Sequence, residues 1–378
     1  MPEPLRLAFL GDPNSLHTRR WVAWFADRGH DVRLIDPYAT RLTDGFPGNV
    51  RVEPFAPPRR RIPLVSLIAR RRGLRRLLEN LNTQVLHGHF VRRFGWQAAL
   101  SGFRPLVISP WGSDILRVPR RGVRTRWWNR FTLRSASLVT VSSEGMRVAA
   151  VRAGARPERV QLIHHGVDTA AFAPGPPDPE LAARLAIGSA AVIVSPRSIR
   201  PLYHQRVVVD AFARLVSGGR DLVLVLSARG ADPTTLAEVR ARAAAGGIED
   251  RLRILDDVPH HDLPALFRLA DVIVSVPDTD SFPVTLLEAM ACERTIVASD
   301  LPAVTPVLRE LSATAASLIA PVGDVAGTAA AIERALGLGP DVRSEMGSRL
   351  RAHVVQTADY ETNMARMERL YQQLAAGR

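Results

Sequence analysis

Short apolar runs alternate with longer segments of helical spacing from one end of the chain to the other. Residues 5–12 have the pattern of a strand and its following loop, residues 17–30 that of a helix ending near Gly29, and residues 31–36 that of a second strand. The same rhythm restarts at residue 190 and includes a further strand pattern over 271–277. Strands that alternate with crossover helices are typical of parallel sheets, so the pattern predicts an α/β fold.

Two domains are expected from the length and from one break in the pattern. The chain has 378 residues, and the proline-rich segment 170–185 separates its two halves. We predict an N-terminal domain over residues 1–172, a C-terminal domain over residues 173–357, and a last helix over residues 358–378 that packs back toward the first domain. Two doubly wound, Rossmann-like domains with parallel sheets would face a central cleft and bind their ligand there, at the carboxyl ends of the strands.

The net charge of the chain indicates which kinds of molecule it could bind. Basic residues number 50 against 37 acidic ones, a formal net charge of +13, and all of these basic residues are arginines. Guanidinium groups bind phosphates bidentately, so the excess favours nucleotide phosphates, anionic lipid or nucleic acid. The single cysteine, Cys292, excludes an intrachain disulfide, and no apolar run reaches the ~18 residues that a membrane span requires. The N-terminus lacks the pattern of a signal peptide, and we expect a cytoplasmic protein.

The stretch DSFPVTLLE, residues 280–288, places two carboxylates at the ends of an apolar run. A helix with Pro283 in its first turn would be apolar almost all round, so Glu288 needs a buried partner: a hydroxyl, an amide or an arginine. Eight residues at ~1.5 Å each span about 12 Å, roughly a ribose, a diphosphate and a sugar, with the amides around 283–285 facing the diphosphate. The simpler alternative is that the first carboxylate or Ser281 caps the helix and that Glu288 pairs with a structural arginine.

In the order of its motifs the chain resembles the retaining family-4 glycosyltransferases of the GT-B fold, the glycosyl transferases group 1. Residues 280–304 are similar to the acidic motif of that family, in which two glutamates lie eight positions apart. Residues 257–277 match the segment before it, residues 160–168 match the run Ile-Pro-Asn-Gly-Val-Asp that ends the first domain, and residues 15–36 match the first βαβ unit. The resemblance implies a GT-B fold in which the N-terminal domain binds the acceptor and the C-terminal domain binds a nucleotide-sugar donor.

The resemblance also implies roles for individual residues. Glu288 would hold the ribose hydroxyls of the donor, Asp280 the transferred sugar, and Arg197 the diphosphate, and these three are the implied catalytic residues. The implied donor-binding residues are Gly11, Asn14, Ser15, Arg197, Arg206, Ser281, Phe282, Pro283, Val284, Thr285 and Glu288. The family's second basic ligand is a lysine, which this chain lacks, so Arg200, His204 or Arg206 would replace it, with Arg206 slightly preferred.

Two departures from the family pattern put the donor's identity in doubt. Asp280 replaces a glutamate, which shortens the reach of the carboxylate, and Pro283 replaces a glycine, which removes an N–H group. An inactive relative is therefore one alternative. The string Asp278-Thr279-Asp280 also spells DxD, which holds a divalent metal in another glycosyltransferase fold. The two-domain organisation favours the metal-independent class, so we expect no metal and no cofactor.

Polar residues that follow strand patterns in the first half are candidates for positioning the sugar or the acceptor. His89, Trp111 and Asp114 would face the cleft, with His87 as the alternative to His89. Many relatives have a histidine where this chain has Trp111, and its ring offers a plate for a sugar face or a lipid. The structural alternatives are a hydrogen-bonded loop histidine and a packed indole.

Arginines mix with apolar residues over 58–81, and with Trp127 and Trp128 over 117–131. Such segments suit an anionic bilayer, which would place the protein peripherally on the inner face of the cell membrane. The alternative is that they form ordinary crossover helices with solvated outer faces.

The sequence thus predicts a retaining hexosyl- or related glycosyltransferase. It would move a sugar from a nucleotide-diphosphate donor to a glycan or lipid-linked acceptor, in the synthesis of a cell-surface polysaccharide or glycolipid. Its partners would be donor, acceptor and an anionic membrane surface, with no nucleic acid. Two alternatives stay open: a sugar-nucleotide epimerase of the same fold, and a non-catalytic arginine-rich relative that binds nucleic acid or membrane, which leaves Glu288 unexplained.

Overall fold

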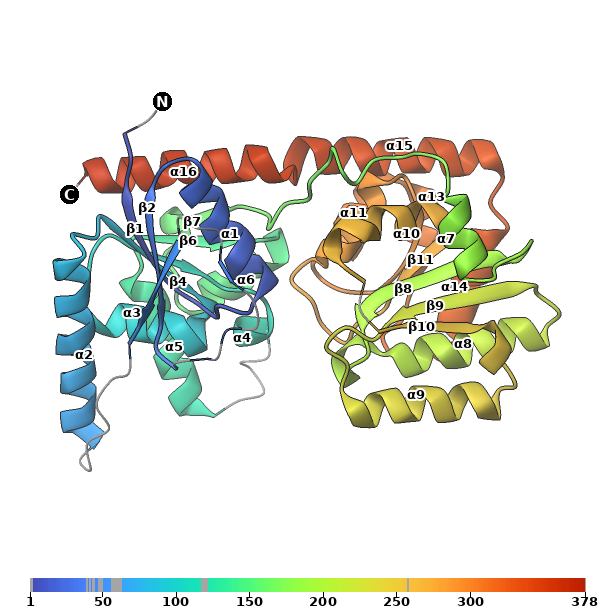
Figure 1. Ribbon diagram of the computed structural model, residues 1–378, viewed down its shortest axis with the longest axis horizontal. Coiled ribbons are helices and arrows are strands. Elements are labelled where there is room, and N and C mark those ends of the chain that lie inside the picture. Colours follow the sequence, from blue (N-terminus) through green and yellow to red (C-terminus); the bar gives the residue numbers. More distant parts are fainter. Residues whose placement is uncertain are drawn as a thin grey trace. The chain divides into compact units, whose positions relative to one another are not determined.

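The computed structural model describes residues 3–38, 40, 42, 45–46, 50–55, 63–116, 122–256 and 258–377 (Figure 1). The chain divides into two compact units: the first contains Met1–His165 and Glu361–Arg378, and the second Gly166–Tyr360. Each unit has its own parallel sheet. Within the described ranges, no helix combines the length and the apolar character needed to cross a membrane.

The first unit is built on a seven-stranded sheet with the order β3-β2-β1-β4-β5-β6-β7. Strands β4, β5 and β6 are buried at every position, as expected where helices cover both faces of a parallel sheet. The elements of this unit are β1 (Arg6–Leu10), α1 (Leu16–Asp27), β2 (Asp31–Asp36), β3 (Val50–Pro54), α2 (Pro63–Asn80), β4 (Val85–His89), the π-helix η1 (Phe90–Gly95), α3 (Trp96–Leu100), β5 (Leu106–Ser109), α4 (Ser113–Leu116), α5 (Val123–Ser135), β6 (Leu138–Val141), α6 (Glu144–Ala153), the 3-10 helix η3 (Pro157–Arg159), β7 (Val160–Leu162) and α16 (Tyr360–Ala376).

The second unit has a six-stranded sheet with the order β10-β9-β8-β11-β12-β13. Its elements are α7 (Pro179–Arg184), β8 (Ala191–Ser198), η4 (Pro201–Tyr203), α8 (Gln205–Ser217), β9 (Leu222–Ser227), α9 (Pro233–Ala245), η5 (Glu249–Arg251), β10 (Leu252–Leu255), η6 (His260–Asp262), α10 (Leu263–Leu269), β11 (Val272–Ser275), α11 (Val284–Ala291), β12 (Thr295–Ser299), α12 (Thr305–Leu311), α13 (Ala313–Ser317), β13 (Ile319–Ala320), α14 (Val325–Leu336) and α15 (Pro340–Thr357).

Both sheets are doubly wound. The strand order runs outward in one direction from β1 and in the other from β4, and the second sheet reverses in the same way between β8 and β11. Right-handed crossovers that change direction put helices on both faces of a sheet. The prediction of two Rossmann-like α/β domains with parallel sheets is therefore confirmed.

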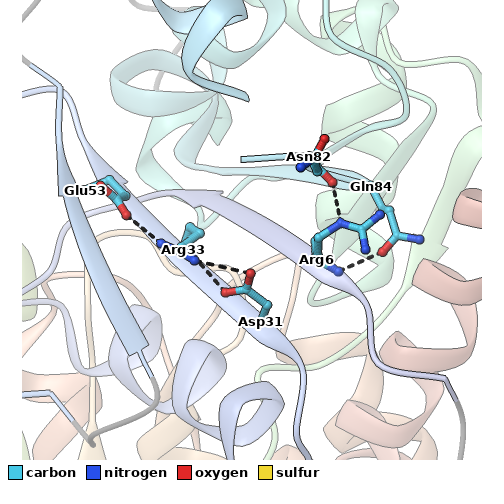
Figure 2. A network of polar contacts seen from close by, with 6 residues as sticks. All are labelled: Arg6, Asp31, Arg33, Glu53, Asn82 and Gln84. Atoms are coloured by element: carbon cyan, nitrogen blue, oxygen red, sulfur yellow. Dashed lines mark hydrogen bonds and ion pairs between the residues drawn. The ribbon is translucent and has the colours of Figure 1, made fainter. Parts of the chain in front are cut away.

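Polar contacts join neighbouring strands of the first sheet, as Figure 2 shows. Arg33 on β2 donates from Nε to Asp31 Oδ1 at 2.8 Å and from Nη1 to Glu53 Oε1 on β3 at 2.9 Å. Arg6 on β1 donates from Nε to the carbonyl of Asn82 at 2.7 Å, and its amide donates to Gln84 Oε1 at 2.8 Å. These contacts tie β3 to β2, and β1 to the chain that enters β4.

The last helix completes the core of the first unit. Tyr371 on α16 is fully buried, and its hydroxyl lies 2.5 Å from His87 Nδ1 on β4 and 3.3 Å from Trp21 Nε1 on α1. His87 Nε2 in turn lies 2.6 Å from the hydroxyl of Ser109 on β5. Glu368 of the same helix lies 2.8 Å from His30 Nε2. Residues far apart in sequence thus share one buried polar network.

The proline-rich segment expected to link the domains is part of the second unit. Phe172, Leu181 and Leu185 belong to its hydrophobic core, and the Phe172 ring lies 5.8 Å from that of Phe267. Residues 166–172, which we assigned to the first domain, therefore pack with the second. The apolar residues among the prolines are what anchor this segment.

His87 makes the stability of the first unit depend on pH. Burial lowers the pKa of His87 to about 3, whereas in an unfolded chain a histidine binds a proton near pH 6.5. Below pH 6.5 the unfolded state therefore binds a proton at His87, whereas the folded state does not. The free energy of unfolding consequently decreases as the pH falls. We expect His87→Gln to lower stability at neutral pH and to flatten this slope by about 1.4 kcal/mol per pH unit between pH 6.5 and 4.

Tryptophan fluorescence during urea unfolding measures this effect, because all six tryptophans lie in the first unit. His261→Gln is the matched control, since the side chain of His261 is 82% exposed. An unchanged slope in His87→Gln would contradict the assignment of a neutral, buried imidazole.

Candidate functional site

The carboxyl edge of the second sheet is where a ligand of a doubly wound fold is expected. Such ligands bind where the strand order reverses, beyond the carboxyl ends of the strands. Here the reversal lies between β8, which ends at Ser198, and β11, which ends at Ser275. The loops that follow the two strands meet, because the Asp278 amide donates to the Leu202 carbonyl at 2.9 Å.

Arg197 and Asp280 form a partly buried ion pair at this edge. Arg197 Nη2 donates to Asp280 Oδ2 at 2.8 Å, with the two side chains 14% and 13% exposed. The register between β8 and β9 shifts between Ser195 and Ser198, and a bulge of this kind re-aims the side chains within it. The guanidinium also lies over the ring of Tyr203, 4.1 Å from its centroid. A guanidinium has five N–H groups, so donors remain for a second anion.

Helix α11 begins directly after Pro283, which occupies the N-cap position and not the first turn that we predicted. The first N–H groups of a helix have no acceptor within it, and Val284 and Thr285 therefore present amides that favour an anion. Phe282 has a φ of 142°, which a phenylalanine adopts only under strain, and such strain is typical of functional sites. Asp280 Oδ1 accepts from the Ser281 amide at 2.7 Å and so holds this strained turn.

Glu288 is 3% exposed, and its partner is a histidine. Its Oε1 accepts from His260 Nε2 at 2.9 Å, and the His260 ring lies 5.4 Å from that of Phe172. The hydroxyl, amide or arginine that we expected is thus replaced by an imidazole. Oε2 has no hydrogen bond from any residue that the structure describes. The sequence signal for His260 was its position in the 257–277 segment, directly before a helix.

Four side-chain atoms at this edge are buried without a hydrogen-bond partner among the described residues. They are the hydroxyls of Ser198, Ser275 and Thr285, and Nδ1 of His204. Two of these residues end the strands beside the reversal, and the other two lie at the beginnings of α8 and α11. Buried polar groups in proteins are nearly always hydrogen-bonded, so this gathering indicates a place for ligand atoms or water.

The cations expected beside Arg197 differ in their surroundings. Arg206 Nη1 donates to Glu238 Oε2 on α9 at 2.6 Å, and Arg200 Nε donates to the Gly230 carbonyl at 2.6 Å. His204 has a left-handed backbone, with a φ of 51°, and precedes α8. Both arginines are therefore already engaged within the protein, whereas His204 Nδ1 lacks a hydrogen-bond partner among the described residues.

In the first unit, the loop after β1 lies at the corresponding reversal. The Asp12 side chain accepts from the Asn14 amide at 3.0 Å, and its carbonyl accepts from the Ser15 amide at 3.1 Å. Ser15 is the N-cap residue of α1. Gly11 is needed because a Cβ there would lie 3.0 Å from Thr18 and 3.2 Å from His89. The glycine thus allows close packing of this loop on β4.

His89 ends β4 and is fully buried. Its Nδ1 lies 3.2 Å from the Thr18 hydroxyl, and its Nε2 has no hydrogen-bond partner in the described part of the chain. Burial, with smaller effects from His87 and His165, lowers the pKa of His89 well below its ordinary value, so the imidazole is neutral. The π-helix η1 follows immediately, and π-helical turns occur frequently at functional sites.

Two histidines that the sequence analysis did not select join Trp111. The ring of His17 stacks on that of His165 at 4.9 Å, and both lie 5.7 Å from the Trp111 ring, which is 4.9 Å from His89. Burial lowers the pKa of His165 well below its ordinary value. Sequence signals existed for both, because His17 follows the loop after β1 and His165 lies in the 160–168 segment.

Asp114 has its carboxylate engaged by backbone amides. Its Oδ2 accepts from Val91 at 2.7 Å, and its Oδ1 accepts from Trp111 at 3.1 Å and from Gly112 at 2.9 Å. Burial raises the pKa of Asp114, although these hydrogen bonds act in the opposite direction. The residue ties the loops after β4 and β5 together, so any effect on a sugar would be through the positions of Trp111 and η1.

The DxD string does not form part of a larger ligand group. Among the described residues, no three or more histidine, cysteine, aspartate or glutamate side chains lie close enough to hold a metal ion. Asp280 faces Arg197 and the Ser281 amide, as described above.

Two family models match the chain. One, described as glycosyl transferase 4-like, matches residues 6–143, and the other, described as glycosyl transferases group 1, matches residues 190–337. A D-inositol 3-phosphate glycosyltransferase from Jonesia denitrificans is 31% identical over 179 residues, 45% of this chain and 42% of that protein. The chain spans about half the length of the curated relatives that it matches.

Solved structures share the fold over nearly the whole chain. A glycosyltransferase from Rickettsia africae has a TM-score of 0.80 at 14% identity and covers 99% of both chains. Anabaena HepE, in complex with UDP and glucose, has a TM-score of 0.74 at 17% identity and covers 97% of this chain and 99% of that one. With one matching family model in each unit and this shared architecture, the chain belongs to the glycosyltransferases of the GT-B fold, with a glycosyl transferase 4-like first part and a glycosyl transferases group 1 second part.

Proposed function

We propose that the protein transfers a sugar from a nucleotide-diphosphate donor to a hydroxyl of a glycan or lipid-linked acceptor, with retention of the anomeric configuration. The observation that carries the proposal is the carboxyl edge of the second sheet. There Arg197 pairs with Asp280 of the acidic motif, α11 begins directly after Pro283, and four buried polar atoms at the strand ends and helix starts have no partner among the described residues. A diphosphate flanked by sugar hydroxyls supplies the charge and the hydrogen bonds that such a site lacks.

We assign the ribose, the diphosphate and the sugar of the donor to successive residues along this edge. Glu288 Oε2 would accept from the ribose hydroxyls while Oε1 stays on His260. Arg197 and the first amides of α11 would hold the diphosphate, with His204 as the second basic ligand. Asp280 would accept from hydroxyls of the transferred sugar while Arg197 neutralises its charge.

The chemical step that we infer is a displacement on one face of the sugar. The bond between the anomeric carbon and the diphosphate oxygen breaks, and the acceptor oxygen bonds to that carbon from the same side. The acceptor's proton passes to the departing phosphate oxygen, so no side chain has to form a covalent intermediate. Arg197 and the α11 amides would stabilise the negative charge that develops on the leaving group.

The first unit would hold the acceptor and part of the sugar. His89 offers Nε2 to a hydroxyl, Trp111 and His17 offer ring faces, and the loop of Gly11, Asn14 and Ser15 would approach the donor. We place the reaction in the synthesis of a cell-surface polysaccharide or glycolipid, at the inner face of the cell membrane. The basic surface of the first unit supports this setting.

Replacing Glu288 tests the donor site. A panel of UDP, GDP and ADP in a thermal-shift assay selects the base, and UDP comes first because Anabaena HepE binds it. We expect Glu288→Gln, which keeps a hydrogen bond for His260, to weaken the selected nucleotide about 10- to 100-fold, because a charge-assisted hydrogen bond to the ribose is lost. Titration calorimetry measures the affinity, and Glu310→Gln removes the same charge from an exposed site. Equal affinity in wild type and Glu288→Gln would remove Glu288 from the donor site.

Asp280→Asn should separate binding from chemistry. The amide keeps an acceptor for the Ser281 N–H but loses the charge that orients the sugar, so we expect nucleotide affinity within about threefold of wild type. The slow hydrolysis of the matching nucleotide-sugar, followed as released nucleoside diphosphate without acceptor, should fall about 100-fold. Asp278→Asn is the control, and an equal loss in both variants, reversed by added Mg²⁺ or Mn²⁺, would support a metal-binding DxD and contradict our assignment.

Comparing His204→Ala with Arg206→Ala tests which residue is the second basic ligand of the diphosphate. We expect His204→Ala to weaken the nucleoside diphosphate about tenfold and to leave the weak binding of the free nucleoside unchanged, because the imidazole would contact only phosphate. Arg206→Ala should alter neither affinity by more than about twofold, because Glu238 already engages that guanidinium. The reverse result would assign the role to Arg206.

A further inference from the structure

The first unit carries a continuous strip of arginine and aromatic side chains across three helices. Arg70 on α2 lies over Trp96 on α3, 5.5 Å from the ring centroid, and the Trp96 ring lies 5.6 Å from that of Trp128 on α5. Trp128 contacts Trp127 at 4.9 Å, and Trp127 stacks on Phe131 at 5.9 Å with only 6° between the planes. Helices α3 and α5 pack against each other in this unit, and Arg70 joins α2 to α3 through Trp96 (Figure 1). We call these five residues the arginine–tryptophan strip.

The outer end of the strip exposes large apolar groups. Helix α5 turns Asn129, Thr132 and Leu133 inward, which leaves Val123 and Trp127 on its outer face. Trp127 is 57% exposed and Val123 is 74% exposed. On α2, Val65 and Ile68 are 44% and 42% exposed. Four of the eleven exposed large apolar side chains in the described residues thus lie on these two helices, and Val123 and Trp127 are the most exposed of the eleven.

The helices that carry these apolar groups have many arginines and almost no acidic residues. Helix α2 carries five arginines and α5 carries four, whereas Glu79 is the one acidic residue on α2, α3 and α5. Among the described residues, Arg75 is the one of these nine arginines that forms an ion pair, and its partner is Glu79. The arginine-rich stretches 58–62 and 117–121 that precede the two helices lie outside the described residues. A surface with this composition is complementary to an anionic one.

We propose that this face of the first unit docks on an anionic lipid surface, with Trp127 and Val123 entering the headgroup region and the arginines contacting lipid phosphates. An exposed indole beside arginines is typical of residues that lie at a membrane interface, because the ring is apolar while its N–H remains among the headgroups. A nucleic acid is less well matched, because stacking on bases requires several accessible rings and Trp96 and Trp128 are half-buried. The inference rests on the proposed function for its setting, since it would bring the acceptor-binding unit to a lipid-linked acceptor.

Vesicle sedimentation tests this surface without donor or acceptor. Full-length protein is mixed with vesicles of phosphatidylcholine alone or of phosphatidylcholine with phosphatidylglycerol, and tryptophan emission is recorded on the same samples. We expect sedimentation with the anionic vesicles alone, a blue shift of the emission, and weakening as salt is raised. The proposal is overturned if the protein stays in the supernatant with both kinds of vesicle, as it would if this face bound another protein. Equal binding to both kinds of vesicle also overturns it.

Paired variants locate the binding face. Val123→Ser with Trp127→Ser should lower the vesicle affinity about tenfold or more and remove the blue shift, and Arg124→Gln with Arg126→Gln should lower the affinity about tenfold. The controls change matched exposed residues of the second unit: Val342→Ser with Val355→Ser, and Arg184→Gln with Arg240→Gln. Equal losses in variants and controls would mean diffuse charge attraction and would also overturn the proposal.

Nucleoside diphosphate affinity, measured on the same proteins, should be unchanged in the two variants of the first unit, because the donor edge lies in the second unit. It should also be unchanged in the two controls, because their residues lie on α7, α9 and α15 and not among the donor-binding residues. Vesicle binding without nucleotide binding would contradict the proposed function alone, and nucleotide binding without vesicle binding would contradict the docking surface alone.

Discussion

The reversal of strand order in each sheet is the constraint on which the rest of the structure depends. Crossover helices leave β8 and β11 in opposite directions, so the carboxyl ends of these two strands are not covered by a connection between them. Several polar atoms at these strand ends have no hydrogen-bond partner among the residues that the structure describes. They include the hydroxyls of Ser198 and Ser275 at the strand ends, and His89 Nε2 lacks a partner in the described part of the chain at the matching place in the first unit.

Charged residues at such an edge need partners within the protein. Arg197 and Asp280 satisfy each other across the loops after β8 and β11, and Glu288 is satisfied by His260. In the part of the chain that the structure describes, Arg197 donates to Asp280 from Nη2 alone, and Glu288 accepts from His260 through Oε1 alone. Such half-satisfied pairs hold side chains in place while leaving capacity for a ligand, which is the arrangement that a preorganised anion site requires.

The first unit depends on residues from the end of the chain. Tyr371 lies in a buried network with His87 and Trp21, and Glu368 contacts His30, so α16 supplies part of this unit's interior. Without α16, His87 and Trp21 would lose the Tyr371 hydroxyl, and the rings of Phe9 and Phe25 would lose the Tyr371 ring that packs on them. The first unit therefore cannot complete its core until the C-terminal residues of the chain are present.

The sequence by itself determined the fold class and the position of the acidic motif. The alternation of strand and helix patterns is a local property of the chain, because side-chain spacing follows the period of each element, and it was enough for two parallel-sheet units. The burial of Glu288 followed from its apolar neighbours along one helix. The proline content of residues 170–185 misled us, because prolines mark a break in regular structure and do not report whether Phe172 is packed.

Partner choice was decided by the tertiary structure alone. His260 is hydrogen-bonded to Glu288, 28 residues away in sequence, and His17 stacks on His165, 148 residues away. Arg206 forms an ion pair with Glu238 on the next helix. Asp114 likewise turned out to hold three backbone amides in two separate loops. Hydrogen bonds and ring contacts depend on distances of a few ångströms, and those distances arise only when the crossovers have brought distant segments together. Periodicity along the chain carries no record of them.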